Sequence, residues 1–269
     1  MAEQGRRNPD HGGVPAARSR ASSGQAPVIG FVRCPVHGHA ISSVCANCGI
    51  RHVSVCAALD DDELHALESI MTHRQFGPRQ SLVIEGDEAA SAYNVIAGGL
   101  KLFKSLADGR TQMVGFLLPG DFLGLPRHGA YAYSAETLGP TELCQFPRDR
   151  LLDVFDRYEA LQERVLSTVH DELAAAQEHM LLLGRKRALE RLGSFLLGLH
   201  TRMERLGGAT DPLYIPLHRD EIAEYLGTTI ETVSRSFTQL RNDGLIRLQK
   251  TDQVSILDRP GLEALSAGA

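Results

Sequence analysis

No run of apolar residues in this sequence reaches the roughly 18 residues that a membrane-spanning helix needs, although 43% of its 269 residues are hydrophobic. The first 25 residues contain arginines but no apolar core that would make them a secretory signal peptide. No internal repeat is evident. These absences exclude a membrane protein, and we expect a soluble cytoplasmic protein of about two domains.

Signatures of catalysis are also missing. No paired carboxylates, nucleophile elbow or glycine-rich phosphate loop occurs in a suitable context. The glycine pairs Gly98-Gly99 and Gly207-Gly208 are interpreted as turns. We therefore do not expect an enzyme.

Cysteine is scarce, and its distribution is uneven: four residues lie close together and one is remote, namely Cys34, Cys45, Cys48, Cys56 and Cys144. Structural disulfides are not expected inside the cell. A Cys-x2-Cys pair by itself is typical of a zinc site, which nearby side chains would complete: Cys34, His37, His39 and His52. A single cysteine in an apolar strand, such as Cys144, is typical of an ordinary buried thiol.

Basic residues are not in excess over the whole chain, whose formal net charge is −5. Residues 185–250 nevertheless contain 11 Lys and Arg against 8 Asp and Glu, a net charge of +3. The positive charge is therefore concentrated where phosphates would be contacted, which favours nucleic-acid binding by the C-terminal third.

The first half of the chain divides into three segments. Residues 1–33 are rich in Gly, Ala, Ser, Pro and Arg, which predicts a disordered arm. Residues 34–58 form the cysteine-rich segment. In residues 59–147 a short helix behind acidic residues 60–62 precedes short apolar runs that alternate with glycine turns, and Asp108-Gly109 is a strong hairpin signal. This pattern predicts a cupin-like β roll.

A long proline-free stretch over 148–184 predicts a helix. Its apolar residues recur every three or four positions, as in a seam for a partner helix: Leu166, Val169, Leu173, Ala176 and Met180. The alternative is that this stripe packs against the β roll of its own chain. A second helix is expected over 186–204.

Residues 217–240 have the pattern of a helix-turn-helix, followed by a hairpin wing over 245–257. Gly227 suits the turn, and Thr228 is expected to cap the second helix. The buried positions expected in the two helices are Ile222, Ala223, Leu226, Ile230, Val233, Phe237 and Leu240. The predicted fold class is α+β, with an N-terminal β roll, a long dimerisation helix and a winged helix-turn-helix within 185–269.

The second of these helices leaves a polar face free. Glu231, Ser234 and Arg235 share one side at i, i+3 and i+4. In a major groove Arg235 can bond guanine, Glu231 can accept from cytosine and Ser234 can bond several base edges. Phosphate contacts are expected from Thr228, Thr229 and Arg241. Two alternatives without DNA remain open: a capping box of Thr228 with Glu231, and a surface ion pair of Glu231 with Arg235.

From Cys45 to Leu257 the sequence resembles the CRP/FNR superfamily of bacterial transcription regulators, with β roll, long helix and winged helix-turn-helix in that order. Glu231-x-x-Ser234-Arg235 is similar to the FNR-type recognition helix. The resemblance implies a homodimer on double-stranded DNA, with palindromic TTGAT-like half-sites about one turn, or ~34 Å, apart. It also implies RNA polymerase as a partner.

Two sensor chemistries compete within this superfamily, cyclic nucleotide and iron–sulfur cluster. Tyr133 precedes Ser134-Ala135 where cAMP-binding relatives have arginine, so we expect no cyclic nucleotide. The spacing Cys45-x2-Cys48-x7-Cys56, with a remote Cys144, looks like the FnrN/FnrL branch. That resemblance implies an oxygen-labile 4Fe–4S cluster held by these four thiolates, an oxygen- or redox-responsive regulator active at low oxygen, and Cys34 as a non-ligand. The alternative is a FixK-type regulator without a cluster, using zinc or free thiols.

The predicted seam departs from the family at one residue. FNR relatives can carry an aspartate near Ala176, whose charge opposes dimerisation until the cluster is bound. An apolar residue here leads to the hypothesis that the dimer depends less on the cluster. Analytical ultracentrifugation of cluster-free protein would then show substantial dimer, whereas a clean monomer would contradict the hypothesis.

Overall fold

Residues 45, 48–124 and 129–268 are described by a computed structural model of the chain. The expected arm over 1–33, Cys34, His37 and His39 lie outside these residues. Among the described residues, the first named elements are the 3-10 helix η1 (Val55–Ala58) and helix α2 (Asp61–Ile70). Asp60 caps α2, with the Glu63 side chain accepting from the Asp60 N–H in return, so the helix begins at the predicted acidic cluster.

Eight strands form the predicted β roll as two four-stranded antiparallel sheets, ordered β1-β8-β3-β6 and β2-β7-β4-β5. Their bounds are β1 (Thr72–Phe76), β2 (Ser81–Val83), β3 (Ser91–Ala97), β4 (Leu100–Ser105), β5 (Thr111–Leu117), β6 (Phe122–Leu123), β7 (Ser134–Thr137) and β8 (Thr141–Pro147). The expected Asp108-Gly109 turn joins β4 to β5, with Gly109 at φ 84°. One apolar core includes the fully buried Val95, Leu100 and Leu143.

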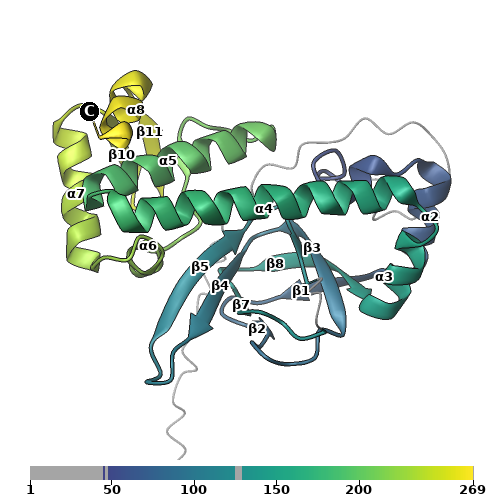
Figure 1. The fold of residues 1–269 in the computed structure, drawn as a ribbon. Coiled ribbons are helices and arrows are strands. Elements are labelled where there is room, and N and C mark those ends of the chain that lie inside the picture. Colours follow the sequence, from purple (N-terminus) through teal and green to yellow (C-terminus); the bar gives the residue numbers. More distant parts are fainter. Residues whose placement is uncertain (1–44, 46–47, 125–128, 269) are drawn as a thin grey trace, which may run out of the picture.

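The stretch predicted as one helix over 148–184 is divided into α3 (Arg148–Phe155) and α4 (Glu159–Arg185). The correction has a packing reason. Phe155 and Leu161, on either side of the break, belong to the same buried cluster. In one continuous helix these two residues would face different sides, so the break allows both to reach the cluster. Helix α4 then runs across the β roll toward the C-terminal module (Figure 1).

Residues 188–268 form that C-terminal module around a second core. Its elements are α5 (Ala188–Arg205), β9 (Leu213–Tyr214), α6 (Arg219–Tyr225), α7 (Ile230–Asn242), β10 (Ile246–Lys250), β11 (Gln253–Ile256) and α8 (Arg259–Ala267). The predicted wing is the antiparallel pair β10–β11. Helix α8 was not expected; it packs on α5, where Ser266 and Leu262 lie against Gly193.

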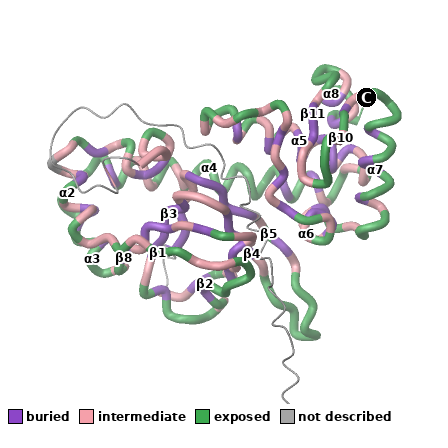
Figure 2. The backbone as a smooth tube through the Cα atoms, turned by 180° about the vertical axis from the view of Figure 1, so that it is seen from behind, coloured by how far each residue is buried: buried purple, intermediate pink, exposed green. Residues whose placement is uncertain are grey.

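Burial follows this division of the chain. The strands of the roll and the inner faces of α5 and α7 are buried, whereas the outer side of α7 is exposed (Figure 2). Within the described residues, no helix is both long and apolar enough to cross a membrane.

Candidate functional site

Helix α7 owes its position to one buried face and one side-chain cap. Val233, Phe237 and Leu240 are at most 2% exposed, and they anchor the helix in the C-terminal core as predicted. The cap differs from the prediction: Thr229 rather than Thr228 precedes the helix, and its hydroxyl accepts from the Thr232 N–H. The alternative of a capping box formed by Thr228 and Glu231 is therefore wrong, because the cap is Thr229.

The three predicted base-contacting side chains lie together on the exposed face of α7. Glu231, Ser234 and Arg235 are all exposed. Without DNA, Arg235 donates to the Thr232 hydroxyl at 3.2 Å. The pKa of Glu231 is lowered by hydrogen bonds from its own N–H and from Thr229, with a smaller effect of Arg235. Glu231 thus makes contacts within the start of the helix, while Ser234 and Arg235 extend from a rigid helix face.

Residues proposed for phosphate contacts surround this face. Thr229 and Arg241 are exposed at the two ends of α7, and Thr228 is partly buried in the preceding turn. Ile230, which the apolar spacing predicted to be buried, is 48% exposed. It stands in the first turn of α7, beyond the edge of the core, four residues before Ser234. The sequence feature that could have indicated this exposure is the position of Ile230 directly after the helix cap, where the helix has not yet reached the core.

The other candidate site lies at the opposite end of α4. Cys144, on β8, is 7% exposed and belongs to a buried cluster with Val55 and Phe146, against which Cys45 and Cys56 pack. Cys48 is close enough to influence the ionisation of Cys56 and Cys144. The structure therefore brings together four thiols that the sequence predicted as a set.

Burial raises the pKa of three of these thiols, which disfavours their thiolate form. It raises the pKa of Cys45 to about 12, and the neighbouring Glu68 carboxylate contributes to the rise. It also raises the pKa of Cys56 to about 11. Burial and the other three cysteines raise the pKa of Cys144 as well. Cysteine thiolates are the ligands of iron–sulfur clusters and are common ligands of zinc, and binding of either displaces the thiol protons.

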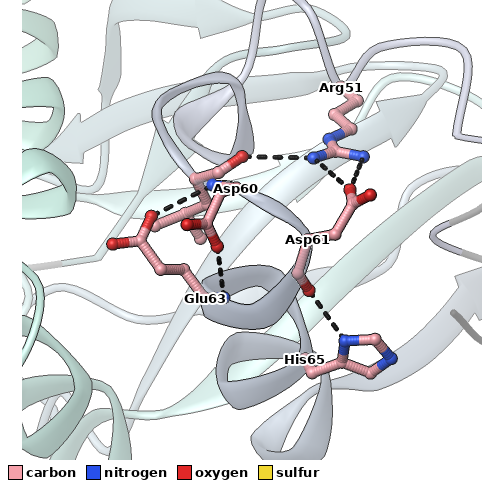
Figure 3. A network of polar contacts seen from close by, with 6 residues as sticks. Arg51, Asp60, Asp61, Glu63 and His65 are labelled. Atoms are coloured by element: carbon pink, nitrogen blue, oxygen red, sulfur yellow. Dashed lines mark hydrogen bonds and ion pairs between the residues drawn. The ribbon is translucent and has the colours of Figure 1, made fainter. Parts of the chain in front are cut away.

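The cysteine segment is tied to its surroundings by two arginines. Arg51 donates to Asp61 Oδ1 and to the Leu59 carbonyl, which joins the segment to the start of α2 (Figure 3). Arg164 of α4 donates to the Val53 carbonyl at 3.0 Å. The segment before Cys56 is thus hydrogen-bonded directly to the long helix.

Within the described ranges, no group of three or more His, Cys, Asp or Glu side chains is arranged so that it could hold a metal ion. His52, one of the residues considered for zinc, is exposed. The other residues considered, Cys34, His37 and His39, lie outside those ranges.

The predicted helix seam is uncovered on this chain. Leu166, Val169, Leu173 and Met180 are between 49% and 65% exposed, and Ala176 is exposed between them. The alternative, that the stripe packs against its own β roll, is therefore wrong. The side of α4 that faces its own chain is marked instead by Leu161, His179 and Leu182, which are buried.

Tyr133 stands immediately before β7, at the position used to argue against a cyclic nucleotide. It is partly buried against the β-roll core, and burial raises the pKa of its phenol. The following residue, Ser134, accepts a hydrogen bond from the Glu85 N–H at 3.0 Å. This position carries a neutral side chain.

Two family profiles match successive parts of this architecture. Residues 73–158 match the cyclic nucleotide-binding domain, which here is the β roll with α3. Residues 190–265 match the Crp-like helix-turn-helix domain. The two matched domains thus follow one another along the chain in the same order as the β roll and the C-terminal module of the structure.

Relatives match over most of the chain. The chain is 41% identical to the nitrogen fixation regulation protein FixK of Bradyrhizobium diazoefficiens, over 83% of this chain and 94% of that protein. It is 38% identical to the transcriptional activator protein FnrL of Cereibacter sphaeroides, over 80% and 88%. The structure of FixK2 from Bradyrhizobium japonicum matches with a TM-score of 0.69 and 32% identity, covering 74% of this chain and 99% of that one.

The chain therefore belongs to the CRP/FNR family of transcription regulators, and it is a DNA-binding protein of the α+β class predicted from its sequence. The relatives named above are regulators rather than enzymes. They include both a FixK and an FnrL protein, so the family is established while the nature of the signal is a separate question.

Proposed function

We propose that this protein is an oxygen-responsive transcription regulator that binds a 4Fe–4S cluster through Cys45, Cys48, Cys56 and Cys144. The observation that carries the proposal is the gathering of four thiols, one of them buried and three partly buried, at one end of α4. Arg164 joins their segment to that helix. When bound, the cluster supplies a group that oxygen destroys. The chain's own contribution is to hold the thiolates and to connect them to the dimerisation helix.

The proposed output is a homodimer on a palindromic site. The exposed stripe of α4 would be covered by the same stripe of a second copy, and each copy would place one α7 in the major groove. Arg235 would bond guanine, Ser234 and Glu231 would bond neighbouring base edges, and exposed Ile230 would contact a thymine methyl group. Half-sites resembling TTGAT are expected, with RNA polymerase as a protein partner and no cyclic nucleotide.

The free-thiol alternative is less compatible with the site. A redox-sensing cysteine that reacts directly is an accessible thiol with a lowered pKa. Here the pKa values of Cys45 and Cys56 are raised to about 12 and about 11, and Cys144 is buried. Burial disfavours the thiolate form of these cysteines, and a bound metal would stabilise it.

A FixK-type regulator without a cluster is the second candidate, favoured by the 41% identity to FixK. Purification without oxygen separates the two. The cluster predicts brown protein with about four irons and four sulfides per chain that bleaches in air. Colourless protein with stoichiometric zinc would overturn the cluster and favour the second candidate.

A further inference from the structure

The C-terminal end of α6, the first helix of the helix-turn-helix, is held by three elements outside the motif. The last carbonyls of a helix lack the N–H groups of a following turn, so other donors must satisfy them. Three side chains donate to three consecutive carbonyls, at 2.8, 2.8 and 2.7 Å: Gln112 to Glu224, His179 to Tyr225 and Arg191 to Leu226. Because a carbonyl only accepts, the His179 Nε2 carries the proton.

Each donor comes from a different element outside the helix-turn-helix. Gln112 belongs to β5 of the β roll, His179 to α4 and Arg191 to α5. Arg191 also donates to the carbonyls of Leu183 and Lys186, at the end of α4. A cation at the C-terminus of a helix is favourable for the helix dipole as well. The end of α6 is therefore fixed to the β roll, to α4 and to the α4–α5 connection at once.

The Glu224 side chain adds an ion pair from the β roll. Its carboxylate lies 2.6 Å from Lys101 Nζ of β4 and accepts from the Thr111 hydroxyl of β5 at 3.0 Å. The side chains of Lys101 and Glu224 are only 17% and 20% exposed. Such a pair is screened by salt much less than a fully exposed one.

Apolar contacts join the same elements. Tyr225 stacks on His179 with ring centroids 4.1 Å apart and an interplanar angle of 11°. Its ring also meets Phe116 of β5 edge-on at 5.3 Å and lies 5.9 Å from Phe195 of α5. Hydrogen bonds, an ion pair and aromatic packing thus converge on the last two residues of α6.

Helix α7 begins only a few residues after the end of α6. Only the turn through Gly227, at φ 58°, and the cap Thr229 separate Leu226 from the first residue of α7. A Cβ on Gly227 would come 3.0 Å from Leu183 Cδ2, so the turn lies against the end of α4. We propose that Gln112, His179 and Arg191, together with the Lys101–Glu224 pair, are positioning residues that fix the direction of α7 relative to the β roll and α4.

The proposal is tested by measuring the orientation of α7 within one chain. Fluorophores on unnatural amino acids replace two exposed residues, Leu106 on the β4–β5 hairpin and Gln239 on α7, and single-molecule energy transfer gives their distance distribution. Lys101→Glu or Glu224→Lys alone should broaden or shift the distribution. The double variant, which restores an opposite-charge pair, should bring it back. Because neither a cluster nor a dimer is needed, failure of the proposed function would leave this test intact.

A matched pair of milder variants keeps the test available if a charge reversal prevents folding. Gln112→Ala removes the side-chain hydrogen bonds to the Met113 and Glu224 carbonyls. Gln75→Ala removes a side-chain hydrogen bond within the β roll, to Glu142, and does not touch α6. Gln112→Ala should lower affinity for a palindrome by about threefold to tenfold while leaving affinity for an isolated half-site unchanged. Gln75→Ala should change neither affinity. An unchanged distance distribution, or an equal loss on both DNAs, would overturn the proposal.

Discussion

The exposed face of α7 and the cysteine site differ in the sequence distance that each spans and in their exposure to water. Ser234 and Arg235 are neighbours on one helix, and both are exposed. Cys56 and Cys144 come from η1 and β8 and share a buried cluster. Base contacts need a rigid surface that local helix geometry provides, whereas a metal site needs donors that only the tertiary fold brings together. Substitutions in α7 should therefore affect base recognition, whereas substitutions at the cysteine site should affect metal binding.

The largest effect is expected from removing the remote thiol. Cys144→Ser should abolish stoichiometric iron binding and reduce anaerobic palindrome binding to the level of air-exposed wild-type protein, because three thiolates leave one corner of the cluster open. Iron analysis and a DNA-binding titration measure both quantities. Cys34→Ser is the matched control and should retain iron. Retention of full iron content by Cys144→Ser would remove Cys144 from the ligand set.

Next in size is a charge in the exposed stripe of α4, which lies between the two regions. Leu173→Glu should weaken dimerisation at least about tenfold, because burying an unpaired carboxylate costs more than the ~1.4 kcal/mol that a tenfold change requires. Sedimentation velocity measures the dimer. Ser167→Glu, exposed on a different side of α4, is the control and should leave it intact. An undisturbed dimer in Leu173→Glu would mean that the stripe is not the interface.

A smaller and sequence-dependent effect is expected on α7. Arg235→Ala should cost about 1–3 kcal/mol on half-sites that contain guanine, through loss of a bidentate base contact. Arg241→Ala should weaken binding to all sequences alike and reduce the salt dependence, as expected for a phosphate contact. Fluorescence anisotropy on specific and scrambled duplexes distinguishes them. An equal loss for Arg235→Ala on both duplexes would show that it does not bond a base.

The smallest effect concerns the cap of α7. Thr229→Ala should destabilise the protein by about 1 kcal/mol, because the Thr232 N–H loses its acceptor. Denaturant unfolding of the two single variants compares Thr229→Ala with Thr228→Ala. A larger cost for Thr228→Ala would restore the cap that the sequence predicted.

The sequence was sufficient where a pattern is local. The exposed face of α7, the β4–β5 turn at Gly109 and the acidic start of α2 all follow from spacing, turn chemistry or capping, and the structure confirms each of them. Ile230 shows the limit of spacing. The helical period places it on the apolar side, but the core does not extend to the first turn of α7.

Contacts between distant residues were beyond sequence reasoning. Lys101 and Glu224 are 123 positions apart, and Gln112 and Glu224 are 112 apart, yet together they hold the end of α6. The break between α3 and α4 has the same origin, because it depends on a buried cluster assembled from separate elements. For the cysteines, the family resemblance supplied the grouping that the residues alone left open between zinc and a cluster.

We propose that the cysteine site controls DNA binding through a cluster. The most direct measurement follows one sample of anaerobically purified protein as air is admitted, recording cluster absorbance and affinity for a TTGAT-type palindrome together. We expect the absorbance and the palindrome affinity to fall in parallel, while affinity for an isolated half-site stays constant. Full palindrome affinity after complete bleaching, or protein that contains no iron from the outset, would contradict the account.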